Sequence, residues 1–419
     1  MSSIIFKGIT LVDENFCHQE AMFVGVTDNC IDYVGKEYKN GYKREYDGIN
    51  KCLIPAFYNA HAHSPMVLMR GYAENLFLSD WLNNKIFPFE ATLTEEDIYM
   101  SMLLSVAEML SFGCISTTDM YFKGEAMAKA VIESGVKSNI SLAATVYNSD
   151  ALKKEYPALI KQYGNISDRL KIDISVHAPY TSTPELVKDF SDMAVDYGLN
   201  MHIHLSETEQ ENIECKKKYG LTPTEYFEKG GIFRVPTTAA HCVYLEDDDI
   251  EIIKKYNVTV ATCPTSNLKL ASGYCDVKRL FESGIKVALG TDSVASNNNL
   301  DMFGDMELFA ILPKGIKRDP IVITPAQTLF AATRSGALSQ GRDDCGCITV
   351  GNRADLSVIN LDKPHLTPVH DILNTLIYSA NGSDVVLTMS DGKILYENGE
   401  FKTIDIEKVK SYARKRIKG

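Results

Sequence analysis

The sequence predicts an α/β fold, a (β/α)8 barrel of the TIM type that carries a small β-sandwich built from the N- and C-terminal segments. Three observations predict it. Eight short, apolar, strand-like runs alternate with longer segments of helical period between residues 52 and 345. The residues on either side of this region alternate β-like runs with turns. Six of the nine histidines lie in or just beyond the C-terminal halves of four of these runs, which is where such a barrel builds an active site.

The expected β-sandwich combines residues 1–54 with residues 346–400, and the barrel takes residues 55–345. Runs such as "SIIFKGITLV" before the barrel and "VVLTMSDGKILYENGEF" after it have the alternation and the turn residues of paired strands. The last segment, residues 401–419, contains the basic amphipathic stretch "IDIEKVKSYARKRIKG". This stretch predicts a helix docked on the surface.

Each barrel strand is expected to lead into a helix. One helix begins with Thr94 and Asp97, close to a capping box, and ends at Gly113. Another has Pro184 in its first turn and Gly198 as its stop. The strand-like runs are residues 52–57, 114–120, 139–146, 171–179, 200–207, 237–244, 258–266 and 286–293.

Composition narrows the classes of function. The chain has 419 residues, of which 45% are hydrophobic and 23% are charged, as is typical of a soluble globular protein. The formal net charge of −12 argues against binding to nucleic-acid phosphates, which needs clustered lysine and arginine. No apolar stretch is long enough to cross a bilayer, and no secretion signal is visible. We therefore expect a cytoplasmic protein with a small-molecule substrate, no nucleic-acid or membrane partner, and free, mostly buried cysteines.

Two histidines, His61 and His63, follow an apolar run and lie one residue apart. Because alternate residues of a strand point to the same side, their imidazoles are expected to converge. His204 lies near the end of the fifth run and Asp292 near the end of the eighth, so a barrel brings all four side chains to one mouth. Three nitrogens and one oxygen suit Zn²⁺ and are acceptable to Fe²⁺ or Mn²⁺. The sequence thus predicts one divalent metal ion per chain, although each histidine taken alone fits a packed core residue equally well.

Two neighbours of His204 have different expected roles. Glu207 follows it by three residues, so one short turn beyond the strand places its carboxylate over the metal, where a proton shuttle would have to stand. Taken alone, this position suits a solvated loop residue just as well. His202 precedes it by two residues and lies one layer deeper in the barrel. We expect His202 to pack in the core or to support the metal ligands.

Five pieces of the sequence, in this order, resemble the amidohydrolase superfamily. They are the His-x-His motif, "HLSE", "AHCVYL", "TCPTSNLKLASG" and "LGTDSVASNNNLDMF". The similarity is closest to the cytosine deaminase and chlorohydrolase branch with one metal, and "GCITVGNRADLSVINL" is similar to the returning β-sandwich strand of that family. Within this branch, the stretch from "LSDWLNNKIFPFEATL" to "GCISTTDMYF" resembles the methylthioadenosine/S-adenosylhomocysteine deaminases.

The resemblance implies a reaction of purine salvage, in which water removes the 6-amino group of an adenine nucleoside and gives the inosine analogue and ammonia. The metal would lower the pKa of a bound water from about 15.7 toward 7. Glu207 would give a proton to ring N1, Asp292 would accept the proton of the attacking water, and His241 would hold the hydroxide. The residues implied as metal ligands are His61, His63, His204 and Asp292.

The resemblance also implies a nucleoside pocket. Trp81 and Glu90 would pack over the nucleoside and bind the ribose hydroxyls, and His177 and Ser296 would line the same pocket. Family members that bind the carboxylate of a homocysteine-type substrate supply arginines after the third strand, whereas residues 144–165 here contain none. Lysines there lack the planar fork that grips a carboxylate at two points. We therefore expect methylthioadenosine, adenosine or 5'-deoxyadenosine to be better substrates than S-adenosylhomocysteine.

Three alternatives stay open at this point. A binuclear hydrolase of the same superfamily needs a bridging lysine at the end of the fourth strand, where this sequence has His177. A one-metal deaminase or chlorohydrolase of a free base, guanine or a triazine does not need the ribose contact implied for Glu90. A non-catalytic barrel kept for binding or assembly would have lost some of the metal ligands. The family also implies a homo-oligomer.

Overall fold

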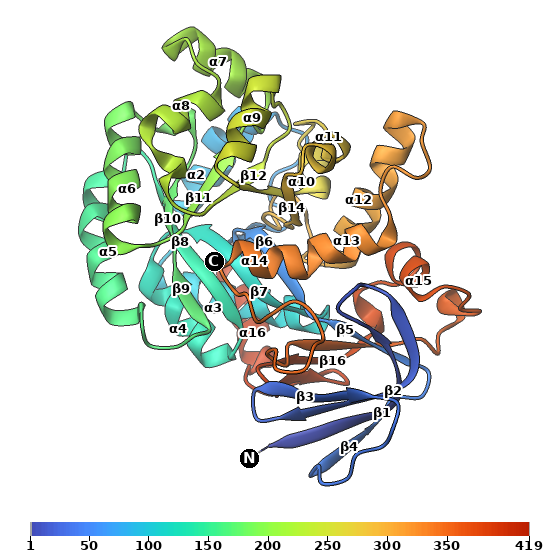
Figure 1. Cartoon of the computed structure of the whole chain (residues 1–419). Helices are drawn as coiled ribbons and strands as arrows, with labels where there is room; N and C mark the ends of the chain where they lie inside the picture. Colours follow the sequence, from blue (N-terminus) through green and yellow to red (C-terminus); the bar gives the residue numbers. More distant parts are fainter. Residues whose placement is uncertain (1, 419) are drawn as a thin grey trace.

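The central unit of the computed structural model, which describes residues 2–418, is a parallel barrel of eight strands surrounded by helices (Figure 1). Neighbouring strands pair in chain order, as expected for repeated β/α units. The first and last strands meet where the amide of Asp292 donates to the carbonyl of His61, at 3.0 Å. A short strand, β9 (Leu170–Ile172), pairs beside β8. The barrel strands are β6 (Phe57–Ala62), β7 (Cys114–Tyr121), β8 (Lys137–Ala144), β10 (Ile174–Val176), β11 (Met201–Leu205), β12 (Thr237–His241), β13 (Thr259–Thr262) and β14 (Lys286–Leu289).

Two helices of the barrel begin where the sequence indicates, although the first of them ends at Ser111, two residues before the expected stop at Gly113. In α3 (Glu95–Ser111), Thr94 and Asp97 form the capping box, because each side chain accepts a hydrogen bond from the other residue's amide. Helix α6 (Pro184–Tyr197) ends at Gly198, whose φ of 64° suits glycine. The other helices of this region are α4 (Gly124–Ser134), α5 (Ser149–Tyr163), α7 (Glu209–Tyr219), α8 (Pro223–Gly230), α9 (Asp247–Lys255), α10 (Pro264–Lys269), α11 (Val277–Glu282), α12 (Met302–Lys317), α13 (Pro325–Ala332) and α14 (Arg334–Ser339).

A chain of short helical turns connects the first barrel strand to α3. It contains η1 (Ser64–Met69), α1 (Leu78–Trp81), η2 (Leu82–Ile86) and α2 (Phe87–Glu90). Side chains from the last three turns line the same cavity as His63. This segment therefore forms one wall of the space at the mouth of the barrel.

Strands from both ends of the sequence form a second, mixed sheet. Strand β5 (Lys51–Pro55) pairs in parallel with β1 (Ser3–Val12) and antiparallel with β15 (Leu356–Asn360), so it joins the N- and C-terminal segments. Apolar side chains from both segments pack in a core of their own. The expected fold class, a barrel with a β module made from the two terminal segments, is confirmed. The remaining strands of this sheet are β2 (His18–Thr27), β3 (Cys30–Gly35), β4 (Arg44–Asp47), β16 (Val385–Ser390), β17 (Lys393–Glu397) and β18 (Glu400–Phe401).

One prediction about the strands is wrong. Most of the first strand-like run, residues 52–57, lies in β5 of the terminal sheet, and barrel strand β6 begins only at Phe57. Cys52, Leu53 and Ile54 are all fully buried, so their apolar pattern does not distinguish a strand of that sheet from a barrel strand. As a result, His61 lies inside the barrel strand rather than after it.

The C-terminal helix α16 (Ile406–Arg416) docks on α3. Asp97 is the anchor, because its Oδ1 accepts hydrogen bonds from Tyr412 at 3.0 Å and from Arg416 at 2.9 Å. Helix α15 (Ile372–Tyr378) contacts α12 and α13 instead. We propose the domain limits 1–54 with 346–400, 55–345 and 401–419, of which residues 1 and 419 lie outside the described part.

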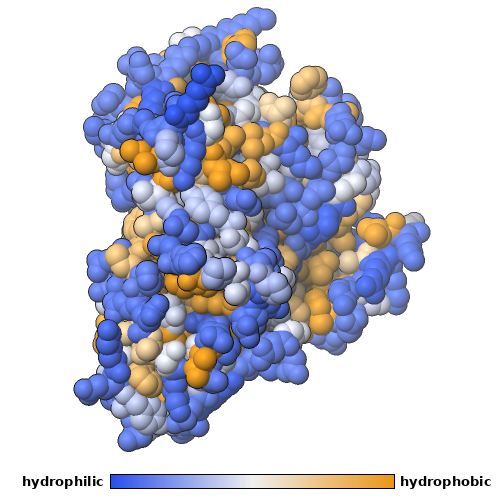
Figure 2. All heavy atoms as spheres, turned by 90° about the vertical axis from the view of Figure 1, so that its right-hand side faces the viewer, coloured by the Kyte–Doolittle hydropathy of each residue, from blue (hydrophilic) through white to orange (hydrophobic). Residues whose placement is uncertain are grey.

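The surface and the cysteines agree with the composition. The face drawn in Figure 2 is mostly hydrophilic, and its hydrophobic side chains form separate patches. None of the helices within residues 2–418 has the length and hydropathy that crossing a membrane requires. All ten cysteines are free thiols, and seven of them are buried.

Candidate active site

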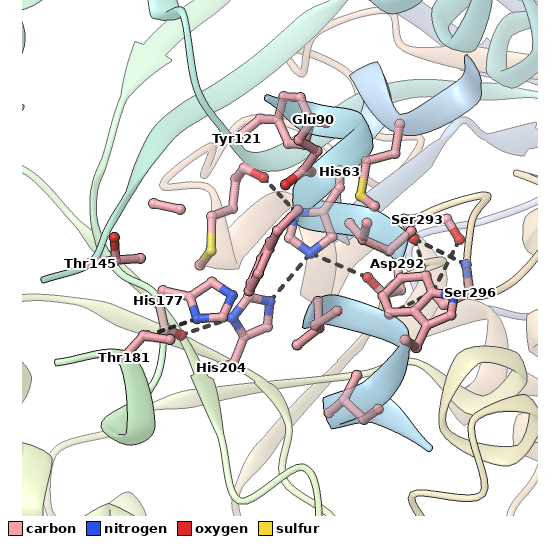
Figure 3. Close-up of a pocket in the computed structure, with 18 of the residues that line it drawn as sticks. His63, Glu90, Tyr121, Thr145, His177, Thr181, His204, Asp292, Ser293 and Ser296 are labelled. Atoms are coloured by element: carbon pink, nitrogen blue, oxygen red, sulfur yellow. Dashed lines mark hydrogen bonds and ion pairs between the residues drawn. The ribbon is translucent and has the colours of Figure 1, made fainter. Parts of the chain in front are cut away.

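Histidines from different strands converge with one aspartate at the C-terminal end of the barrel (Figure 3). Nε2 of His63 lies 3.3 Å from Oδ1 of Asp292 and 3.3 Å from Nε2 of His204. Nε2 of His61 lies 3.5 Å from the same oxygen of Asp292. The structure thus brings together the four side chains predicted as metal ligands, although they come from the first, fifth and eighth strands and the turns beyond them.

The other ring nitrogen of each of these histidines is held by the protein. The partners are Nε2 of His202 for His61, at 2.7 Å, the carbonyl of Met120 for His63, and the carbonyl of His177 for His204, at 2.8 Å. Such contacts fix the ring orientation and tautomer of metal-binding histidines. Nε2 of His61 is buried and has no hydrogen-bond partner within the described residues. This buried nitrogen lies next to a carboxylate oxygen and to the Nε2 atoms of the other histidines. Together these atoms form a donor set that suits a divalent cation.

His202 lies where the alternation of the fifth strand predicts, beneath His204. It is fully buried, and its ring stacks on that of His61 with centroids 5.0 Å apart. Its Nε2 contacts Nδ1 of His61. Of the two roles expected for His202, this geometry favours support of a proposed metal ligand.

His241 ends strand β12 beside the same cluster. Its Nδ1 lies 2.9 Å from Oδ1 of Asn267, and its Nε2 lies 3.9 Å from Oε2 of Glu207. One ligand atom each from His61, His204 and His241 also lies within 4.8 Å of the others. Burial lowers the pKa of His241, but the nearby carboxylates of Glu207 and Asp292 more than offset this and raise it.

Asp292 is ionised and oriented by its surroundings. Burial alone raises the pKa of this carboxyl, but the adjacent imidazole of His61 and those of His63 and His241 lower it far below its ordinary value. Its second oxygen accepts hydrogen bonds from the hydroxyls of Ser266, at 2.5 Å, and Ser296, at 3.0 Å. The carboxylate therefore presents one oxygen to the histidines while the serines hold the other.

Glu207 lies in the turn that follows β11, and its side chain is buried. Oε1 accepts a hydrogen bond from Ser272 at 3.4 Å. Burial is the main cause that raises the pKa of Glu207, and the charge of Asp292 adds to it. A carboxyl that tends to keep its proton beside a cluster of metal-binding groups is suited to acid catalysis.

A cavity of about 330 Å³ opens directly above this cluster. All four residues expected to bind the substrate line it, together with His63, Glu207 and Asp292. These four residues are Trp81, Glu90, His177 and Ser296. The cavity therefore places the expected substrate contacts and the expected acid around one space.

Three side chains of this wall have defined partners. Trp81 is buried, and its indole nitrogen donates to the carbonyl of Ala73 at 3.2 Å. Burial raises the pKa of Glu90 to about 7, although the hydroxyl of Tyr121 and the charge of His63 oppose the shift. Nδ1 of His177 contacts Oγ1 of Thr181 at 2.9 Å, which orients its ring in the pocket.

Several functional contacts were missing from the sequence interpretation. Asn267 orients His241, Ser266 orients Asp292, and Tyr121 lies beside Glu90 in the cavity wall. The stretch "TCPTSN" after the seventh strand was a signal for the first two, because a serine and an asparagine follow a strand end there. Tyr121 ends the second strand, in a position where any large residue would also fit.

Comparison with known proteins identifies similar chains. The model of the amidohydrolase family matches residues 52–395. A 5-methylthioadenosine/S-adenosylhomocysteine deaminase from Dictyoglomus thermophilum is 43% identical over 373 residues, which cover 88% of each chain. A protein of the same name from Dictyoglomus turgidum is 42% identical over 385 residues, which cover 91% of this chain and 90% of the relative. The crystal structure of an adenosine deaminase from Xanthomonas campestris with bound zinc has a TM-score of 0.95 and 29% identity, and the match covers 100% of this chain and 98% of the other.

Proposed function

We propose, on the premise that this chain belongs to the amidohydrolase family, that it is a hydrolytic deaminase of an adenine nucleoside. The observation that carries the proposal is the convergence of His61, His63, His204 and Asp292, of which the last three line one cavity together with the buried acid Glu207. The products are the inosine analogue and ammonia. The names of the similar deaminases and of the similar adenosine deaminase structure support this reaction.

The donor set fits one zinc ion per chain. His61, His63, His204 and Asp292 would hold it, and the unpartnered Nε2 of His61 favours a bound cation. When bound, such an ion supplies hydroxide at neutral pH, because it lowers the pKa of water toward about 7. The zinc in the similar adenosine deaminase structure supports this choice over Fe²⁺ or Mn²⁺.

The remaining chemistry belongs to the side chains of this chain. The raised pKa of Glu207 keeps its proton available for ring N1 while the oxygen of water attacks C6. The ionised Asp292 accepts the proton that this water loses. His241, held through Nδ1 by Asn267, orients the attacking oxygen with its Nε2. Glu207 afterwards helps to carry a proton to the departing amine, so that the reaction consumes one water and releases ammonia.

The wall of the cavity is proposed to select the nucleoside. Trp81 would pack on it, and Glu90 would accept hydrogen bonds from the ribose hydroxyls. His177 and Ser296 would complete the pocket on the other sides. These four side chains favour a nucleoside over a free base such as guanine, because a free base has no ribose hydroxyls that could donate to Glu90.

The charge of the pocket favours a substrate without a carboxylate. Among the cavity-lining residues, all of which the structure describes, there is neither lysine nor arginine. Lys153 lies in the segment where, by the family resemblance, carboxylate-binding members have arginines, and it pairs with Asp189 at 2.6 Å on the outside of the barrel. We therefore propose methylthioadenosine, adenosine or 5'-deoxyadenosine as better substrates than S-adenosylhomocysteine, although the similar deaminases have both in their name.

We place this reaction in purine salvage in the cytoplasm, because its organic product, the inosine analogue, is itself a purine nucleoside. A homo-oligomer is proposed from the family resemblance. Light scattering after gel filtration measures the oligomeric state.

A deamination screen tests the proposed function. Zinc-loaded protein is incubated with adenosine, methylthioadenosine, 5'-deoxyadenosine, S-adenosylhomocysteine, adenine, guanine and cytosine, and the ammonia released is measured. We expect turnover of the first three substrates, less with S-adenosylhomocysteine, and none with the free bases. Turnover of guanine or cytosine in preference to any nucleoside would contradict the proposal.

A further inference from the structure

Two neighbouring helices begin with the same sequence pattern but use its glutamate differently. Both α7 and α8 start with T-x-x-E, in which the threonine hydroxyl accepts the amide of the glutamate at 3.1 Å. In α8, Glu225 completes an ordinary capping box, because its carboxylate accepts the amide of Thr222 at 2.7 Å. In α7, the carboxylate of Glu211 reaches further back along the chain.

The two oxygens of Glu211 hold the turn that carries Glu207. Oε1 accepts the amide of Ser206 at 3.0 Å, and Oε2 accepts the amide of Glu207 at 2.8 Å. All three residues are at most 5% exposed. Hydrogen bonds from amides to a buried carboxylate are among the stronger ones in proteins.

The backbone of this turn needs such support. Ser206 has a φ of 48°, in the left-handed region that residues other than glycine rarely adopt. Its carbonyl accepts the amides of Val243 and Tyr244, both at 3.0 Å, from the turn after the next strand. Glu211 holds Ser206 as well, because its side chain accepts the hydrogen bond of the Ser206 amide. The strained turn is therefore fixed from two elements, and Glu207 projects from it into the cavity.

We infer that Glu211 is a positioning residue, which acts on the reaction by fixing the backbone from which the acid Glu207 projects. The inference rests on the proposed function, since it takes Glu207 as the acid. Glu211 does not line the cavity, so it has no contact with substrate of its own. In an ordinary capping box its carboxylate would accept the amide of Thr208. Here it accepts the amides of Ser206 and Glu207 instead.

The test is Glu211→Gln in the zinc-loaded, full-length chain, with Glu225→Gln as the matched control. Glutamine keeps the shape but has only one acceptor oxygen, so one of the two amides loses its partner. We expect kcat to fall about 10- to 100-fold, because small displacements of a reacting group have effects of this size. KM and zinc content should not change. Glu225→Gln makes the same substitution in the equivalent motif one helix further on, where one acceptor oxygen is enough for the amide of Thr222, and it should leave kcat unchanged.

A double-mutant cycle separates positioning from a general structural effect. If Glu211 acts through Glu207, adding Glu211→Gln to Glu207→Gln should lower the residual kcat little further. A full, multiplicative loss in the double variant would overturn the inference, and so would a Glu211→Gln variant with wild-type kcat. Glu211→Asp keeps the charge but draws the oxygens away from the amides, so activity equal to wild type in this variant would also contradict it.

Amide hydrogen exchange tests the same contact without any substrate. In wild-type protein the amides of Ser206 and Glu207 should be strongly protected. Glu211→Gln should accelerate exchange of at least one of these two amides, while the amides at the start of α8 stay protected. Unchanged exchange in the variant would mean that the carboxylate does not hold the turn. Because this measurement needs no reaction, it distinguishes failure of the inference from failure of the proposed deaminase function.

Discussion

Nδ1 of His61 lies 2.7 Å from Nε2 of His202, and both rings are fully buried. A neutral imidazole carries one hydrogen, so the contact decides which nitrogen of His61 donates and which keeps its lone pair. With Nδ1 donating to His202, the unpartnered Nε2 of His61 is free to bind a cation.

Replacing His202 with alanine is therefore expected to weaken zinc binding about 10- to 100-fold, the usual effect of removing such a supporting contact. Competition with a chelator of known affinity, applied to metal-free protein, measures this change. The matched control is His370→Ala, which removes an exposed histidine outside the site. Equal zinc affinity of the His202 variant and the wild type would show that the contact does not prepare the ligand.

Glu207→Gln should lower kcat by about 10²- to 10⁴-fold, because a positioned acid contributes this much to proton transfer. Zinc content should stay that of the wild type, since Glu207 belongs to neither of the clusters whose atoms are close enough to share an ion. Steady-state kinetics with adenosine and metal analysis of the same sample measure both quantities. Wild-type turnover in this variant would remove Glu207 from the mechanism.

The affinity for ribose should depend on pH through Glu90. Burial raises its pKa to about 7, so the carboxyl gains a proton as the pH falls through this value and loses acceptor capacity for the ribose hydroxyls. We expect KM for adenosine to rise on the acidic side of pH 7, and KM for 2',3'-dideoxyadenosine to stay constant. In Glu90→Gln, KM for adenosine should be high at every pH. Parallel pH profiles for the two substrates in wild type would contradict the ribose contact.

The barrel and the terminal sheet are joined by a buried ion pair. Lys137, on the first residue of β8, pairs with Asp355 and with Asp391, the latter at 2.8 Å, and it is 3% exposed. Lys137→Met leaves the buried carboxylate of Asp355 without its cation, whereas Asp391 keeps its pair with Arg169 at 3.0 Å, so we expect a loss of about 3–5 kcal/mol in the free energy of unfolding. Denaturant titration measures it, with Lys153→Met as the control at an exposed pair that contributes little. A loss no larger than that of the control would show that the pair is dispensable.

The sequence predicted the barrel and the convergence of the four proposed metal ligands because both follow from local periodicity. Alternation within a strand puts His61 and His63 on one side, and parallel strands put His204 and Asp292 at the same end. Contacts that depend on how neighbouring turns pack were not predictable in this way. Asn267 lies 26 residues from His241, and although its place after a strand end marks it as a candidate for the site, its stretch of sequence does not indicate which side chain it contacts.

The limits of local periodicity also explain the misplaced first strand. Residues 52–54 are buried throughout, and a continuous apolar run has no period that shows which sheet it joins. Similarly, the T-x-x-E pattern predicts the start of α7 but not that Glu211 reaches Ser206 instead of closing a capping box. In both cases tertiary packing, and not the local sequence, decides the contact.

The measurement that tests the central claim most directly is an anomalous-difference map at the zinc absorption edge from a crystal of the zinc-loaded protein. We expect one peak per chain, at about 2.0–2.2 Å from Nε2 of His61, His63 and His204 and from a carboxylate oxygen of Asp292. A peak outside this cluster, two peaks within it, or no peak in fully loaded protein would contradict the claim that these four side chains hold a single ion.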